Sequence, residues 1–102
     1  MYENKLSAEE GAGNRVIITV LGQDKVGIIA NVSAILAENN VNILDISQTI
    51  LQDIFTMVMV CDIRHCKVDF GILKDRLDKK GREMGLQIQI QHEDVFQFMH
   101  RV

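Results

Sequence analysis

Residues 22–43 read GQDKVGIIANVSAILAENNVNI and contain the turn around which the rest of the chain is arranged. The residues just before it, 15–21 (RVIITVL), are β-branched and apolar on both faces, which is typical of a strand buried inside a sheet. Gly22 ends this strand, and from Lys25 to Asn39 the apolar residues recur at helical spacing. The stretch therefore predicts a strand, a short turn with two glycines, a helix, and a polar loop that leads into a second strand.

Downstream of this stretch, the pattern predicts a hairpin, a second helix and a last strand. The expected elements are strands at 42–51, 54–63 and 86–91, a helix at 67–84, and a short terminal helix with Asp94 as its N-cap. Asn39 and Asn40 tolerate the left-handed conformation that ends a helix, and Gly85 occupies the same position after the second helix.

The element order βαββαβ favours an α+β ferredoxin-like sandwich, an antiparallel four-stranded sheet with both helices on one face. In this topology the strand at 42–51 (NILDISQTIL) lies at an edge of the sheet. It has no Pro or Lys and is apolar on both sides, whereas monomeric proteins usually protect such an edge. We therefore expect a homodimer paired through residues 42–51, with a tetramer as the alternative.

Composition limits the class of protein. At 102 residues the chain fits one domain, which we place at 14–102, and residues 1–13 are interpreted as a flexible leader or a cloning remnant. The 11 Lys and Arg against 14 Asp and Glu argue against a nucleic-acid partner. No apolar run approaches the roughly 20 residues that span a membrane. Two cysteines without an export signal suggest the cytoplasm.

Several segments together resemble a known family. They are residues 16–43, DKVGI at 24–28, NVNILDISQT at 40–49 and HEDVFQFMHR at 92–101. They are similar to ACT domains, the small amino-acid-binding modules of many metabolic enzymes and regulators. The closer resemblance is to short stand-alone ACT proteins of bacteria and archaea, related to the ACT modules of the glycine-cleavage regulator. It implies a regulatory module that binds an amino acid and acts through dimerisation or by docking on a regulated protein partner.

The resemblance also places a ligand pocket at the turn and at the head of the second strand. The predicted ligand-binding residues are Gly22, Gln23, Asp24, Lys25, Gly27, Ile28, Asn42 and Ile43, with Asn42 contributed by the same chain or by a neighbouring subunit. Val26 stands where many ACT domains have Pro, and Gly22 and Asp24 stand where serine-binding members have His and Asn. The resemblance therefore implies a mode of binding but does not identify the ligand.

The residue types of the turn suit a free amino acid. The start of a helix presents unpaired N–H groups and a partial positive charge, so it attracts a ligand carboxylate near Gly27 and Ile28. Asp24 can accept an ammonium group, and Asn42 offers both a donor and an acceptor. Simpler roles remain open: Asp24 as the helix N-cap, Asn42 as the residue that closes the loop, and Lys25 as a solvated side chain.

Other functions are less well supported by the sequence. An acylphosphatase-type enzyme needs an Arg in the first turn, and GQDKVG has none. RNA binding to the open sheet face needs aromatic residues, and the central strands offer Phe55 alone. Cys61, His65 and Cys66 lack the paired spacing of a zinc site. No cofactor, metal or catalytic residue is predicted, and the main alternative to a ligand-binding module is a purely structural oligomerisation domain.

Overall fold

The computed structural model describes residues 14–95, and the predicted element order is confirmed. The elements are β1 (Arg15–Gln23), α2 (Ile28–Glu38), β2 (Asn42–Leu51), β3 (Ile54–Asp62), α3 (Phe70–Met84) and β4 (Leu86–His92). The suggested leader at 1–13 and most of the expected terminal helix lie outside the described residues. The helical segment after β4 begins at Glu93, so Asp94 lies inside its first turn and is not the N-cap that we expected.

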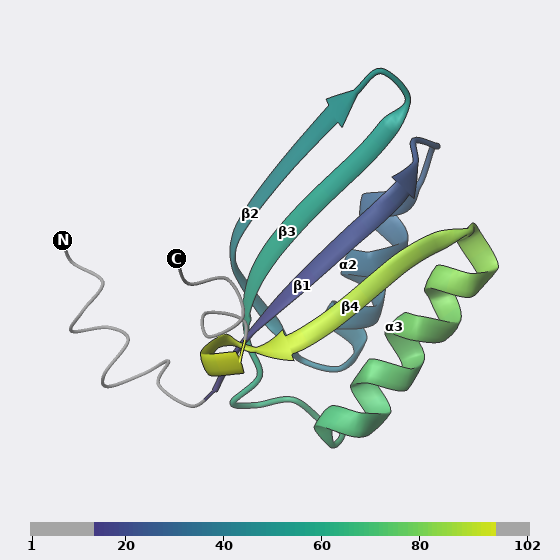
Figure 1. The fold of residues 1–102 in the computed structure, drawn as a ribbon. Helices are drawn as coiled ribbons and strands as arrows, with labels where there is room; N and C mark the ends of the chain where they lie inside the picture. Colours follow the sequence, from purple (N-terminus) through teal and green to yellow (C-terminus); the bar gives the residue numbers. More distant parts are fainter. Residues whose placement is uncertain (1–13, 96–102) are drawn as a thin grey trace, which may run out of the picture.

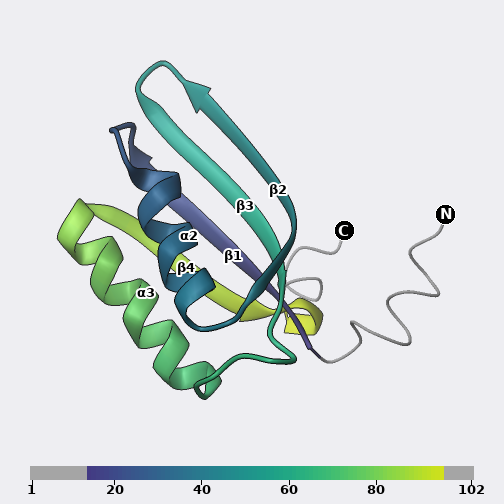
Figure 2. The ribbon, with the colours of Figure 1, turned by 180° about the vertical axis from the view of Figure 1, so that it is seen from behind.

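The four strands form one antiparallel sheet in the order β2-β3-β1-β4. Both α2 and α3 lie on the same face of this sheet, and within residues 14–95 neither of them covers the other face (Figures 1 and 2). This arrangement is the ferredoxin-like α+β sandwich that the sequence predicts. It brings the β1–α2 turn, the β2–β3 turn and the α3–β4 turn to one end of the sheet.

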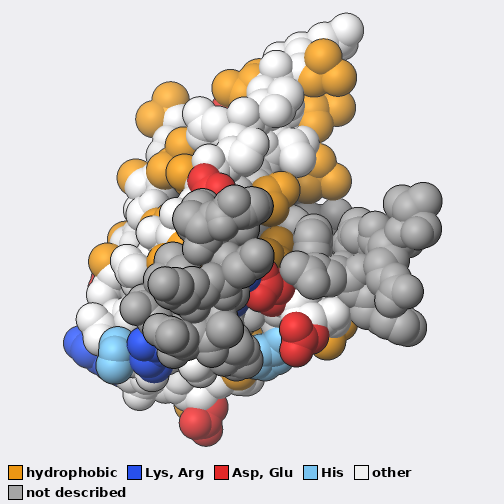
Figure 3. Space-filling model, turned by 90° about the vertical axis from the view of Figure 1, so that its left-hand side faces the viewer, with side chains coloured by type: hydrophobic (Ala, Val, Ile, Leu, Met, Phe, Trp, Pro, Cys, Tyr) orange, Lys and Arg blue, Asp and Glu red, His pale blue; other side chains and the backbone are white. Residues whose placement is uncertain are grey.

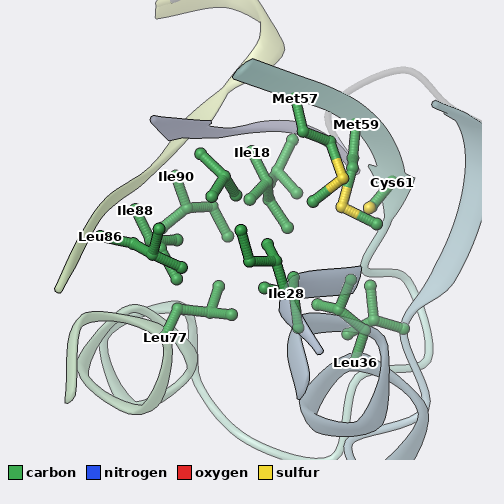
Figure 4. Packing of buried hydrophobic residues seen from close by; sticks show 14 of the residues in the cluster. Ile18, Ile28, Leu36, Met57, Met59, Cys61, Leu77, Leu86, Ile88 and Ile90 are labelled. Carbon is green, nitrogen blue, oxygen red and sulfur yellow. The ribbon is translucent and has the colours of Figure 1, made fainter. Parts of the chain in front are cut away.

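The core lies between the sheet and the two helices. Its fully buried side chains include Val16, Ile18 and Val20 of β1, Met57 and Met59 of β3, Ile28, Val32 and Leu36 of α2, and Leu73 and Leu77 of α3. Figure 4 shows the strand side chains facing Ile28, Leu36 and Leu77. Alternate residues of β1, β3 and β4 supply this layer, as the period of two in a strand requires. The two methionines are therefore core residues.

Both helices begin later than predicted. The first begins at Ile28, three residues after Lys25, because Gly27 has a left-handed backbone with φ of 92° that no α-helix accommodates. The second begins at Phe70, after an extended N-cap at Asp69. Both ends are as expected: Asn40 and Gly85 have positive φ values of 62° and 71°.

Strand β2 is an edge strand, as predicted, and it is unusually apolar for one. Four large hydrophobic residues of β2 and one at the start of β3 are exposed: Leu44, Ile46, Ile50, Leu51 and Ile54. The register with β3 shifts between Ile43 and Asp45, so that Leu44 forms a bulge. Figure 3, seen from the β2 side, shows hydrophobic side chains along both sides of the projecting β2–β3 hairpin. Such an edge is a template for pairing with another strand.

Candidate ligand-binding site

The N-terminal end of α2 has free hydrogen-bond donors. Its N-cap is Gly27, no side chain caps the helix, and no acidic residue lies in the first turn. The first intrahelical bond runs from the Asn31 N–H to the Gly27 carbonyl at 2.9 Å, so the N–H groups of Ile28, Ile29 and Ala30 precede it. Within residues 14–95 these three groups have no hydrogen-bond acceptor. This end of the helix can therefore bind an anion.

Asp24 is not the N-cap, which corrects one of the two roles considered for it. Three residues separate it from Ile28, and the left-handed Gly27 turns the chain between them. Its backbone N–H donates a hydrogen bond to the carbonyl of Asp53, at 2.8 Å, in the β2–β3 turn. Its carboxylate makes no hydrogen bond or ion pair with any residue between 14 and 95. The negative charge of Asp24 is thus available near the free end of α2.

A cavity of about 280 Å³ joins these groups. It is lined by Asp24, Lys25, Gly27, Ile28, Ile29 and Ala30 from the turn and α2, by Gln48 and Ile50 from β2, and by Phe55 from β3. Its volume is near the lower end of the range for small-molecule pockets, roughly 300–1,000 Å³. Four of the eight predicted residues, Asp24, Lys25, Gly27 and Ile28, therefore lie on one concave surface.

Lys25 lines this cavity, and its ammonium contacts the end of α3. Its Nζ donates a hydrogen bond to the carbonyl of Met84 at 2.5 Å, at the C-terminal end of α3, where the helix dipole favours a cation. Lys25 is exposed, as expected for a solvated lysine, and it makes this one contact in addition. The ammonium fastens the β1–α2 turn to the end of α3.

Gly22 and Gln23 position the turn and are not in the cavity lining. A Cβ on Gly22 would lie 2.6 Å from Leu86 Cδ2 and 3.3 Å from the Gly85 carbonyl oxygen, so the absence of a side chain allows β1 to pass close to the α3–β4 turn. Gln23 ends β1 opposite Ile54. The sequence placed both residues at the ligand, whereas the geometry supports a scaffolding role.

Asn42 and Ile43 lie at the other end of the sheet. Asn42 pairs with Asp62, and Asp62 pairs with Arg15 at the start of β1, a full strand away from the turn. Ile43 is opposite Cys61 and packs against the core. Within one chain these two residues do not meet the cavity, so the version of the site completed by Asn42 of the same chain is wrong.

Gln48, Ile50 and Phe55 are cavity residues that the sequence analysis missed. The signal for them was present, because Gln48 and Ile50 alternate on one face of β2 and sit opposite Met57 and Phe55 in the hairpin register. Knowing which strand end faces the turn requires the fold. Phe55 is 3% exposed and belongs to the core on the helix side, so this aromatic ring is not on the open sheet face that RNA would need.

A second cavity, of about 200 Å³, lies between the two helices and has a different character. Its lining includes Lys80 and Glu83, which pair at 3.0 Å, and the hydrogen bond from Lys80 lowers the pKa of the Glu83 carboxyl. Arg76 in the same lining donates to the Asn39 side chain at 2.6 Å. These polar groups have partners within the protein, in contrast to the free N–H groups and the free carboxylate of the first cavity.

The cysteines do not form a site in the described part of the chain. No group of three His, Cys, Asp or Glu residues between 14 and 95 is arranged to hold a metal ion. Burial raises the pKa of the Cys61 thiol to about 12, so this side chain is a neutral core group at ordinary pH. None of the described helices is long and apolar enough to cross a membrane.

The fold and the cavity define a class, a small α+β module with a ligand-sized cavity at its first βα turn. The family can be stated as well. The ACT domain model matches residues 14–91, and the chain belongs to this family. It is 55% identical over 89 residues to a UPF0237 protein of Methanocaldococcus jannaschii, covering 87% of this chain and 99% of the relative.

Two solved structures agree with this assignment. An ACT domain protein from Streptococcus pneumoniae superposes with a TM-score of 0.71 at 42% identity, covering 81% of this chain and 93% of that one. The regulatory subunit of aspartate kinase from Thermus thermophilus has a TM-score of 0.60 at 21% identity, over 76% of this chain and 50% of that one. The second likeness concerns the fold alone.

Proposed function

We propose that this protein is a regulatory module that binds a free amino acid at the β1–α2 turn and reports it through dimerisation or docking on a partner protein. Membership of the ACT family supports the general class of regulatory ligand-binding module. The observation that carries the amino-acid assignment is the cavity that unites free N–H groups of α2 with the unpaired carboxylate of Asp24. A carboxylate and an ammonium group on one small molecule match this pair of charges.

The exposed edge of β2 supports coupling between binding and assembly. Two copies paired antiparallel through β2 would bring the start of one strand beside the end of the other. Asn42 and Ile43 of the partner subunit would then lie near Ile50 and the open side of the cavity. In this arrangement the second chain closes the site, so a ligand that fills the cavity also stabilises the pairing.

A link within each chain supports the same coupling. The hydrogen bond from the Asp24 N–H to the Asp53 carbonyl joins the ligand turn to the tip of the β2–β3 hairpin. A ligand that orders the turn therefore also orders the hairpin that contains the edge strand. The coupling needs no movement of the core.

The test is a thermal-unfolding and light-scattering screen against each common amino acid at millimolar concentration. A ligand present at one hundred times its Kd stabilises the native state by about 2.7 kcal/mol, a melting shift of more than about 10 °C in a domain of this size. We expect at least one amino acid to give such a shift and to change the scattering mass. If none shifts melting or assembly, the alternative of a purely structural oligomerisation domain stands.

Two variants locate the site. Asp24→Ala removes the proposed ammonium partner and should abolish the ligand-induced melting shift. Its free energy of unfolding without ligand should stay within about 0.5 kcal/mol of the wild-type value, because the Asp24 side chain is exposed. Asn42→Ala should weaken the ligand response less than Asp24→Ala. Asn42 pairs with Asp62, the neighbour of the buried, helix-facing Cys61, so its side chain lies on the face of the sheet away from the helices. Normal responses in both variants would show that the site lies elsewhere.

A further inference from the structure

The wall of the cavity opposite α2 is formed by β2 and β3 and contains one polar side chain, Gln48. Gln48 and Ile50 are successive residues on the helix-side row of β2, paired with Met57 and Phe55 of β3. Both of these β3 partners are buried in the core. Gln48 therefore places a carboxamide on a row whose neighbours are apolar. Its amide makes no hydrogen bond to any residue within 14–95, so both its donor and its acceptor are free for a ligand.

The two charged ends of a bound amino acid would occupy the free N–H groups of α2 and the carboxylate of Asp24. The α-carboxylate takes the N–H groups of Ile28, Ile29 and Ala30, and the α-ammonium takes Asp24. The remaining charged residue of the lining, Lys25, is bound to the Met84 carbonyl. An acidic ligand side chain would have to compete with the Met84 carbonyl for the Lys25 ammonium, and a basic one would find no second carboxylate among the cavity residues.

We infer that the ligand is an amino acid with a neutral, hydrogen-bonding side chain, and that Gln48 selects it. The inference rests on the proposed function and specifies the side chain of the ligand, where that function specifies the two charged termini. A carboxamide or a hydroxyl on the ligand satisfies the Gln48 amide, whereas an aliphatic side chain covers the amide and leaves it without a partner. Burying an unsatisfied amide costs free energy, a basic side chain is desolvated without a counter-ion, and an acidic one must first draw Lys25 from the Met84 carbonyl.

The test measures binding of matched amino acids to the full-length protein by calorimetric titration. The probes are asparagine with its apolar and acidic counterparts leucine and aspartate, threonine with its apolar isostere valine, and lysine. We expect asparagine or threonine to bind, and to bind about fivefold or more tightly than its apolar counterpart, as one hydrogen bond allows. Aspartate and lysine should bind more weakly still.

Variants at Gln48 link the selectivity to this side chain. Gln48→Leu should reverse the preference within the pair that binds, because an apolar ligand then meets an apolar wall. Gln48→Glu, which adds an acidic group to the exposed strand and so guards against aggregation, should improve binding of lysine relative to aspartate by about fivefold. Gln89→Leu is the matched control, since Gln89 is exposed on β4 opposite Thr19 and is not in the cavity. Its selectivity should equal that of the wild type.

The outcomes separate the inference from the proposed function. If leucine, valine, aspartate or lysine binds the wild-type protein most tightly, an amino-acid site exists but the inference is wrong. The same holds if a neutral polar ligand binds and both Gln48 variants retain the wild-type order. If no probe and no other amino acid binds, both the proposed function and this inference fail.

Discussion

The two ends of α2 are treated in opposite ways by the rest of the chain. At the C-terminal end, Asn39 is 2% exposed and each of its polar groups has a partner: its amide nitrogen donates to the Ile35 carbonyl at 2.8 Å, its side-chain oxygen accepts from Arg76, and its carbonyl accepts from the Lys67 N–H. Asn40 adds a bond to the His65 carbonyl. At the N-terminal end, three N–H groups have no acceptor within residues 14–95.

This difference identifies where function can reside. Backbone groups at helix ends are normally satisfied by the protein or by water, and the chain satisfies the end that is buried against α3. The end that faces the cavity is left to solvent or to a ligand. Three substitutions, ordered by the expected size of their effect, test whether the two ends of α2 differ in this way.

The largest effect should come from the satisfied end. Asn39→Ala leaves the Arg76 guanidinium and the Ile35 carbonyl without their partner, and we expect it to lower the free energy of unfolding by about 2–3 kcal/mol. Urea denaturation measures this change. Asn40→Gly is the control, because glycine accepts the φ of 62° and loses one exposed hydrogen bond. Similar losses in the two variants would show that burial of Asn39 is unimportant.

A smaller loss is expected at the open end. Gly27→Ala places a Cβ on a residue with φ of 92° and 3.3 Å from the Asn31 amide nitrogen. The left-handed conformation should cost about 1–2 kcal/mol, measured in the same denaturation series. Gly71→Ala is the matched control, because a Cβ there meets nothing within 4 Å and alanine favours the helix. A neutral Gly27→Ala would mean that the turn is not held in this conformation.

The smallest change should be a gain. Ala30→Glu gives the first turn of α2 an acidic residue, which it lacks, and should raise the free energy of unfolding by about 0.5 kcal/mol. The same carboxylate should compete with that of a ligand and reduce the amino-acid-induced melting shift. Ala30→Gln separates charge from size. An unchanged ligand shift in Ala30→Glu would place the ligand carboxylate away from this helix end.

The sequence was sufficient for the order of elements in residues 14–95, because periodicity and the signals at the helix C-termini agree there. The edge position of β2 followed from topology, and Asn40 and Gly85 end their helices as expected. The start of α2 was misplaced, since DKVGI does not reveal whether Asp24 or Gly27 precedes the first helical residue. That choice depends on a backbone angle that only the packed turn fixes.

The site was predictable only where its residues are close together in the sequence. Asp24, Gly27 and Ile28 are local to the turn, so a sequence pattern can place them together. Gln48 reaches the cavity through the pairing of β2 with β3, and the ammonium of Lys25 contacts Met84, which is 59 residues away in the sequence. Contacts of this range depend on the tertiary structure, and no local pattern encodes them.

The hydrogen bond between the Asp24 N–H and the Asp53 carbonyl has an evolutionary consequence. It is made entirely by the main chain, so substitutions at either position other than proline at 24 leave its donor and its acceptor in place. The residue that we propose contacts the ligand can therefore change during evolution while the connection to the hairpin stays intact. A module built in this way can change what it senses without having to reinvent how it responds.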